Sequence, residues 1–210
     1  MYPNPAFRLD DLPSLHRQLE AHALALLISQ SPTGPLVSHL PLWLDPGEGP
    51  YGTLYGHLAR SNPQAEALVE AGQVLAVFQG PQAYVSPALY PSKAEHGRVV
   101  PTWNYQAVHA RGTVEVFDEP ERLLPLLERL TNQHEAGRPL PWRVQDAPAD
   151  YLQGMLRAIR GLRLPIDSLQ GIAKLSQNRN AADHEGVRQG LAASADPGDR
   201  ALARLMTTPS

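Results

Sequence analysis

The chain has 210 residues, a formal net charge of −3 and no cysteine. Without cysteine it has no disulfide, no thiolate nucleophile and no cysteine-ligated zinc or iron–sulfur site. A slightly acidic chain has no overall attraction for nucleic acid, so direct DNA binding would need a local basic patch. The N-terminus lacks a cationic lead before an apolar run, and no apolar stretch approaches the ~20 residues of a membrane span. We therefore expect a soluble, cytoplasmic protein.

Short strands separated by turns dominate the predicted first part of the chain. A helix is expected from an N-cap at Asp10 or Asp11, because Pro13 lies in its first turn. Further along, the predicted elements are strands over Ala23–Ser29, Leu36–Leu44 and Thr53–Ala59, a helix from Asn62 or Pro63 to Ala71, and strands over Gln73–Gln79 and Gln82–Ser86, separated by Gly80-Pro81. Strand, turn and strand in succession indicate a meander.

The second part mixes helices with strands. The predicted elements are a loop over Pro87–Arg98, a strand over Val99–Phe117, a helix over Glu119–Glu135, a proline-rich joint over Arg138–Pro148, a helix over Ala149–Ala158, strands over Ile159–Ile166 and Leu169–Lys174, and a helical tail over Ala181–Met206, interrupted at Ala195–Gly198. This order predicts a mainly β, α+β fold, a small β-barrel decorated by helices, rather than a doubly wound sheet. We expect a barrel domain over residues 1–176 and a helical extension over 177–210, packed on the barrel or on a dimer partner.

Several familiar motifs are absent or misplaced. Gly47–Gly52 matches the glycine pattern of dinucleotide sites, but it follows Asp45-Pro46, contains Pro50 and enters a strand, so a turn is predicted. The eight histidines show no metal-ligand spacing, and His134-Glu135 lacks the second histidine of a zincin. No nucleophile elbow or phosphate-binding loop occurs either. The sequence predicts no catalytic residue and no metal ligand.

The segment Gly56–Gln64 is a candidate phosphate site. Ser61 or Asn62 is expected to cap a helix that begins near Pro63, and a helix N-terminus offers free N–H groups to an anion. Arg60, just before it, can bind phosphate oxygens in bidentate fashion. His57 precedes it on the predicted strand.

The segment Val100–Tyr105 is a candidate ring site. Alternation would place Trp103 and Tyr105 on one face of a strand and Asn104 on the other. A flat ligand with a polar edge needs an apolar flank and hydrogen-bonding groups at that edge, and these residues offer both types. The alternative is a core strand with Trp103 buried. Lys93 in the preceding loop is either a ligand for phosphate or ring, or a solvated lysine.

Amides and cations gather again in Lys174-Leu175-Ser176-Gln177-Asn178-Arg179. Either Ser176 or Asn178 simply caps the tail helix, or Lys174 and Gln177 reach a cofactor.

Together with the window Gln79–Gly112, this signature resembles the PaiB family of FMN-binding negative transcriptional regulators. The resemblance runs along nearly the whole chain from Met1-Tyr2. It implies a flavin-binding split β-barrel, a homodimer with FMN in grooves between the subunits, and a role as a transcription repressor. It also implies that His57, Arg60, Ser61 and Asn62 meet the FMN phosphate.

Two other functions remain open from the sequence. One is an FMN-dependent oxidoreductase resembling the pyridoxamine-phosphate-oxidase-like enzymes; the other is a haem-handling or non-catalytic relative of the same barrel. A dedicated enzyme is not expected. DNA binding has weak support, because tail arginines such as Arg188, Arg200 and Arg204 alternate with Asp and Glu.

Overall fold

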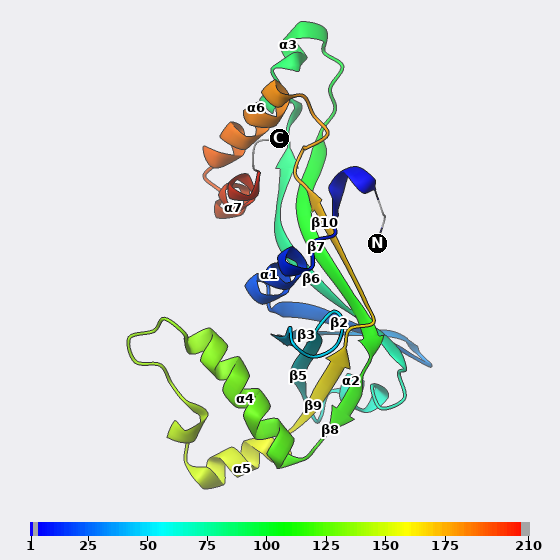
Figure 1. The fold of residues 1–210 in the computed structure, drawn as a ribbon, viewed down its shortest axis with the longest axis vertical. Coiled ribbons are helices and arrows are strands. Elements are labelled where there is room, and N and C mark those ends of the chain that lie inside the picture. Colours follow the sequence, from blue (N-terminus) through cyan, green and yellow to red (C-terminus); the bar gives the residue numbers. More distant parts are fainter. Residues whose placement is uncertain (2–3, 207–210) are drawn as a thin grey trace. The chain divides into compact units, whose positions relative to one another are not determined.

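The computed structural model describes residue 1 and residues 4–206 (Figure 1). Tyr2 and residues 207–210 of the expected extension lie outside the described residues. The strands are β1 (Arg8–Leu9), β2 (Leu24–Ser31), β3 (Gly34–Pro41), β4 (Trp43–Asp45), β5 (Thr53–Ala59), β6 (Gln73–Val85), β7 (Thr102–Thr113), β8 (Glu115–Phe117), β9 (Ile159–Pro165) and β10 (Ser168–Lys174). The α-helices are α1 (Leu12–Ala21), α2 (Pro63–Ala67), α3 (Ser92–His96), α4 (Pro120–Glu135), α5 (Ala149–Arg157), α6 (Ala181–Ala192) and α7 (Pro197–Leu205), with short 3-10 turns at Pro5–Phe7, Pro87–Leu89 and Val144–Asp146.

The chain divides into two compact units. The first unit comprises Met1–Leu15, Gln79–Val108 and Gln170–Ser210, and the second comprises His16–Phe78 and His109–Leu169. Strands β6 and β7 each contribute residues to both units.

In the second unit, a four-stranded antiparallel sheet has the order β4-β5-β9-β8. Here β5 pairs with β9 along its whole length, from Thr53 opposite Pro165 to Ala59 opposite Ile159. Strand β2 pairs with β3 and with the first part of β6. Helix α4 buries three leucines, Leu123, Leu126 and Leu130, in a core that includes Phe117 and Leu156. A leucine-rich helix can require a partner subunit to cover its apolar face, but the apolar face of α4 is already covered within the chain. Its leucines therefore give no support to a dimer.

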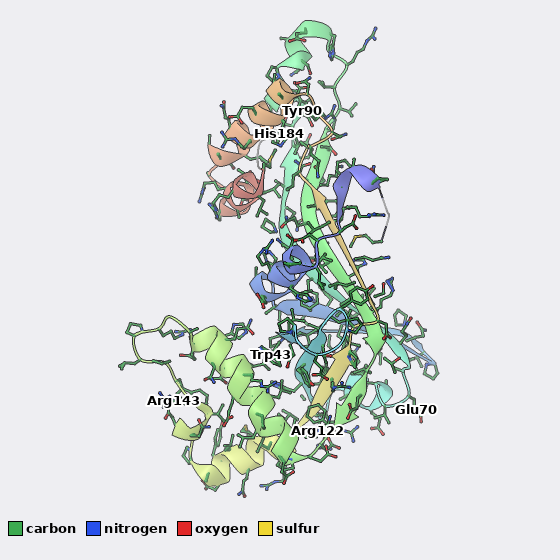
Figure 2. All side chains as sticks on the ribbon, in the orientation of Figure 1. Trp43, Glu70, Tyr90, Arg122, Arg143 and His184 are labelled. Carbon is green, nitrogen blue, oxygen red and sulfur yellow. The ribbon has the colours of Figure 1, made fainter. Side chains whose placement is uncertain are left out.

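In the first unit, strands follow the order β1-β10-β7-β6, and helices α6 and α7 share one core with the end of β6. Val85 and Tyr90 lie in this core with Val187 and Leu202 from the two helices (Tyr90 is labelled in Figure 2). The expected tail helices are thus confirmed. The domain boundary after residue 176 stays a prediction.

A single hydrogen-bonded carboxylate links α3 to α6 in the first unit. Asp183 is buried and accepts hydrogen bonds from the backbone N–H of Ser92 (3.0 Å) and from its hydroxyl (2.7 Å). Burial alone would raise the pKa of the Asp183 carboxyl, but the hydrogen bonds from Ser92 and Asn180 and the charge of Arg179 together lower it.

The α+β class with two antiparallel sheets confirms the expected fold. The helices at α1, α4 and α5 and the turn at Gly47–Gly52 also agree with expectation.

Five details differ from the sequence-based expectation. The strand Leu36–Leu44 divides into β3 and β4, and the strand Val99–Phe117 begins only at Thr102 and divides into β7 and β8. Helix α2 ends at Ala67, and the loop Pro87–Arg98 contains a 3-10 turn and α3. The predicted break at Gly80-Pro81 is wrong, because β6 continues through it. Before the Gly-Pro pair the buried side chains are at even positions, Val74, Ala76 and Phe78. After it they are at odd positions, Ala83 and Val85. The Gly-Pro pair therefore shifts which face is buried without ending the strand.

Candidate functional site

The residues predicted to bind a cofactor divide between the two units. His57, Arg60, Ser61 and Asn62 belong to the second unit, and Lys93, Trp103, Asn104, Tyr105, Lys174 and Gln177 belong to the first. Each group has its own local environment.

Arg60 follows directly after β5, and its guanidinium is held in place. Its Nε donates to the carbonyl of Arg157 (2.9 Å), and its Nη2 donates to Asp118 Oδ1 (2.9 Å) and to the carbonyl of Ile159 (3.2 Å). Arg160 donates to the same Asp118 carboxylate at 3.2 and 3.3 Å. Two arginines therefore share one carboxylate, and this cluster carries an excess of positive charge.

A pocket of about 600 Å³ opens beside Arg60. Its lining is Arg60, Asp118, Pro120, Gln153, Leu156 and Arg157. The neighbouring carboxylate of Glu119 accepts from the backbone N–H of Asp118 (3.1 Å) and lies 3.8 Å from Arg122. Arg60 and Arg160 both donate to Asp118, and Arg157 also lines the pocket. Three arginines against one aspartate give a charge pattern that favours an anion.

Asn62 has a structural role at the same turn. Its side-chain oxygen accepts from the backbone N–H of Gln64 (2.9 Å) as the N-cap of α2, and its amide donates to Ser38 Oγ (2.9 Å). Ser61 is exposed beside it. The capping expected from the sequence is confirmed, while phosphate contacts for Ser61 and Asn62 stay predictions.

His57 lies on β5 opposite Gly161 of β9. Its Nδ1 is buried and finds no hydrogen-bond partner among the described residues. Burial lowers the pKa of His57 below 6.5 because the charged imidazolium loses hydration.

We expect this histidine to make stability pH-dependent. The unfolded state takes up a proton near pH 6.5, whereas folded His57 does so only at lower pH. The contribution of His57 to the free energy of unfolding should therefore be at its maximum above pH 6.5. It should decrease as the pH falls from 6.5 through the pKa of His57 in the folded protein. Urea titrations at pH 7.5 and 5.0 should show a smaller loss for His57→Gln than for the parent or for His134→Gln, which alters an exposed residue. An unchanged loss in His57→Gln would show that His57 does not contribute.

In the first unit, β7 shows the expected alternation. Trp103 is half-exposed, donates from Nε1 to Gln82 Oε1 (3.0 Å) and packs its ring 6.1 Å from that of Tyr84. Asn104 points to the other face and is fully buried, with its amide donating to Ser176 Oγ (2.8 Å) and its Oδ1 unpartnered among the described residues. The aromatic and amide groups of this strand therefore lie on opposite faces, and Tyr105 shares the face of Trp103.

The C-terminal signature forms a turn that is closed by its own side chains. Gln177 accepts from the N–H of Leu175 (2.7 Å) and donates to the carbonyl of Ala173 (2.6 Å). Lys174 donates to Thr102 Oγ1 (2.6 Å). Ser176, with a left-handed φ of 63°, is buried where it meets Asn104. Lys93 is exposed on α3, so a ligand role for these lysines stays a prediction.

Asp118, Gln153 and Arg157 also line the pocket beside Arg60, but the sequence analysis does not predict them as site residues. No local motif links Arg157 to Arg60, because the two residues are far apart in the chain. They meet because β5 pairs with β9 so that Ala59 lies opposite Ile159. Only a correct prediction of that strand pairing would have revealed the pocket.

Two kinds of feature are absent from the described part of the chain. No group of three or more His, Cys, Asp or Glu residues there is arranged to hold a metal ion. None of its helices is long and apolar enough to cross a membrane.

Comparison with known proteins identifies relatives of this chain. The family model described as "Putative FMN-binding domain" matches residues 1–168. Protease synthase and sporulation protein PAI 2 of Bacillus subtilis is 30% identical over 98% of this chain and 96% of its own length. An uncharacterised protein of Aspergillus fumigatus is 35% identical over 91% of this chain and 90% of its own.

Solved structures share the fold at low sequence identity. A FAD and heme binding protein from Mycobacterium smegmatis superposes with a TM-score of 0.59 at 19% identity, covering 80% of this chain and 73% of that one. The conserved hypothetical protein Rv2991 from Mycobacterium tuberculosis gives 0.59 at 12% identity, covering 83% and 91%. The family match over most of the chain and the full-length relative of B. subtilis agree with the sequence resemblance. The chain belongs to the PaiB family, and its residues 1–168 match the model of the FMN-binding domain.

Proposed function

We propose that the protein binds FMN and seats the phosphate in the pocket beside Arg60. The observation that carries this proposal is a pocket of about 600 Å³ lined by Arg60, Arg157 and Asp118, whose one aspartate is shared by Arg60 and the neighbouring Arg160. The family match to an FMN-binding domain names the ligand class, and the cluster offers the charge that a phosphate requires.

The side chains present suit FMN. The hydrogen bonds of Arg60 use Nε and Nη2, which leaves the Nη1 protons for a phosphate. Leu156 and Pro120 offer an apolar flank to a ring, and Gln153 offers both a donor and an acceptor for its edge. Asp118 would compete with the phosphate for Arg60 and Arg160, so affinity should rise when that carboxylate is neutralised.

FMN supplies one- and two-electron redox chemistry when bound. The residues of this chain would bind the cofactor, orient it and neutralise its phosphate. FMN is preferred to FAD in this proposal because the pocket presents one compact group of arginines, while the turn at Gly47–Gly52 lacks the strand-to-helix setting of a dinucleotide site.

Calorimetric titration with FMN tests the proposal. Arg60→Ala and Arg157→Ala should each weaken FMN binding by about 1.5–3 kcal/mol, the scale of a hydrogen bond to a charged group. Arg8→Ala is the matched control, because Arg8 is exposed and pairs with Asp10 in the first unit. Parent-like affinity in both pocket variants would show that the phosphate binds elsewhere. Trp103→Ala tests separately whether the exposed aromatic face of β7 contributes.

We further propose that the protein acts as a negative regulator of transcription and forms a homodimer. This second proposal is supported by the resemblance to the PaiB family and by the full-length relative of B. subtilis, which is named for protease synthesis and sporulation. The tail helices give little support to direct DNA binding. Arg188 pairs with Glu185 at Oε1 and Oε2, and Arg200 donates to the carbonyls of Ser194 and Ala195.

Direct DNA binding should accordingly be weak. We expect a dissociation constant for random duplex no tighter than about 10⁻⁴ M at physiological salt, because the chain is acidic overall and Arg188 and Arg200 of the tail bond within it. Gel-shift titrations at several salt concentrations measure this. Sub-micromolar binding with a steep salt dependence would mean that a basic surface forms on assembly, and repression would then proceed through DNA contact.

A further inference from the structure

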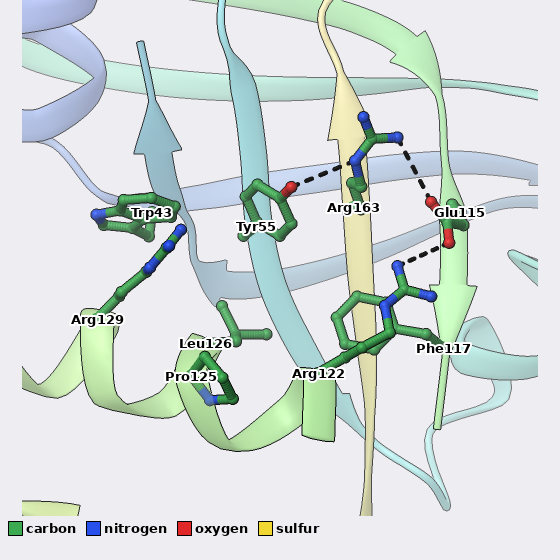
Figure 3. Close-up of a pocket in the computed structure, with 9 residues that line it drawn as sticks. All are labelled: Trp43, Tyr55, Glu115, Phe117, Arg122, Pro125, Leu126, Arg129 and Arg163. Carbon is green, nitrogen blue, oxygen red and sulfur yellow. Dashed lines mark hydrogen bonds and ion pairs between the residues drawn. The ribbon is translucent and has the colours of Figure 1, made fainter. Parts of the chain in front are cut away.

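A second pocket in the second unit is formed by a row of side chains across the four-stranded sheet (Figure 3). Trp43 lies opposite Tyr55, Tyr55 opposite Arg163, and Arg163 opposite Glu115, so each of the four strands contributes one residue to the row. Cross-strand partners point to the same face of a sheet, which explains why these four side chains meet. Phe117, two residues after Glu115, adds a ring on that face.

Helix α4 supplies the opposite wall. Arg122, Pro125, Leu126 and Arg129 are spaced three, four and seven residues from the first, so they share one helix face. The pocket between this face and the row holds about 300 Å³, which is at the lower end of the range for small-molecule sites. We call it the Trp43 pocket.

Most charges in the Trp43 pocket are already neutralised. Glu48 accepts from the hydroxyl of Tyr55 (2.6 Å) and from Arg163. Glu115 accepts from Arg122 (2.7 Å) and from Arg163 (3.4 Å). The bonds with Glu48 raise the pKa of the Arg163 guanidinium, so this network stays ionised at neutral pH.

Arg129 differs from the other two arginines. Its guanidinium stacks 4.6 Å from the centre of the Trp43 ring, and its ion pair with Asp45 is loose, at 3.7 Å. No hydrogen bond of this guanidinium is formed within the described part of the chain, and half of its side chain is exposed. Its planar set of donors is therefore available at the edge of an aromatic pocket.

We propose that the Trp43 pocket binds a small aromatic carboxylate. The aromatic body would lie against Trp43 and Tyr55, since the guanidinium of Arg122 covers the Phe117 ring at 4.0 Å. The carboxylate would accept hydrogen bonds from Arg129, a geometry in which arginine binds carboxylates in bidentate fashion. The net charge of the pocket does not favour an anion, because nearby carboxylates balance its three arginines. Selectivity for a carboxylate over a neutral ligand therefore comes from the unused hydrogen-bond donors of Arg129. The inference is independent of flavin binding, since none of these residues lines the pocket beside Arg60.

Titration with benzoate tests the proposal, with benzyl alcohol as the neutral counterpart and acetate as the acid without a ring. Benzoate should bind saturably, shifting the indole N–H resonance of Trp43 in the ¹⁵N-labelled protein and binding at least about tenfold more tightly than either counterpart. Arg129→Gln should weaken benzoate binding about tenfold or more and leave benzyl alcohol unchanged. Arg138→Gln, which alters an exposed arginine beyond the end of α4, should leave both unchanged.

Three results would overturn the proposal. One is no saturation by benzoate and no shift at Trp43 in the parent protein, a readout that needs no variant to fold. Another is equal binding of benzoate and benzyl alcohol, or equal benzoate binding by the parent and Arg129→Gln. The third is competition between FMN and benzoate, which would assign this pocket to the flavin rather than to a separate acid.

Discussion

Replacing Gly112 by alanine should destabilise the protein by roughly 3 kcal/mol, the upper part of the range for an overpacked site. A Cβ at Gly112 would overlap the backbone carbonyl oxygen of Pro165 and would lie 3.0 Å from a methyl group of Leu164. A backbone carbonyl cannot rotate away as the end of a side chain can, so β7 or β9 would have to shift. Thermal and urea unfolding of Gly112→Ala measure the loss.

Gly154→Ala is the matched control, because it is the same substitution in open space. Gly154 lies inside α5, and a Cβ there would meet nothing within 4 Å. Alanine should stabilise this helix by about 0.5–1 kcal/mol through its higher helix propensity. A loss for Gly112→Ala below about 1 kcal/mol, the lower end of the range for overpacking, would mean that the close approach of Gly112 to Pro165 is not present in solution.

Leu123→Ala should destabilise the second unit by about 2–5 kcal/mol. Leu123 is fully buried in the core that α4 shares with Phe117 and Leu156, and truncation would leave a cavity beneath the helix. Urea unfolding monitored by circular dichroism measures the change. Because α4 forms one wall of the Trp43 pocket, benzoate binding should weaken as well.

Leu140→Ala serves as the comparison, since Leu140 is 91% exposed. This variant should stay within about 0.5 kcal/mol of the parent, as surface substitutions usually do. A loss for Leu123→Ala below about 1 kcal/mol would mean that α4 does not pack on the sheet as described.

Much of the fold follows from local sequence signals. The succession of strands and turns predicts β5 over Thr53–Ala59 with its observed bounds, and the leucines of Glu119–Glu135 predict α4 to within one residue. The continuity of β6 could not be predicted in this way, because Gly80-Pro81 reads as a turn. A proline ends a strand only where its missing N–H is needed by a neighbour, and that depends on the strand pairing.

The candidate sites depend far more on pairing than on local pattern. Arg60 is suggested by its place before a helix cap, yet its companion Arg157 lies nearly a hundred residues away and arrives through β9. The row of side chains in the Trp43 pocket takes one residue from each of four strands, and no spacing in the sequence connects Trp43 to Arg163. Alternation correctly separates Trp103 from Asn104, but it does not reveal that Ser176 holds Asn104 in the interior.

The most direct test of the proposed FMN site is the ratio of affinities for FMN and riboflavin, which differ only in the phosphate. If the phosphate lies among Arg60, Arg157 and Arg160, the parent should bind FMN about a hundredfold more tightly, a difference of roughly 2.7 kcal/mol. The double variant Arg60→Ala/Arg157→Ala should reduce this ratio to within a few-fold of unity while its affinity for riboflavin stays the same. A ratio that is equally large in the parent and the double variant, or no saturable FMN binding at all, would contradict the proposed site.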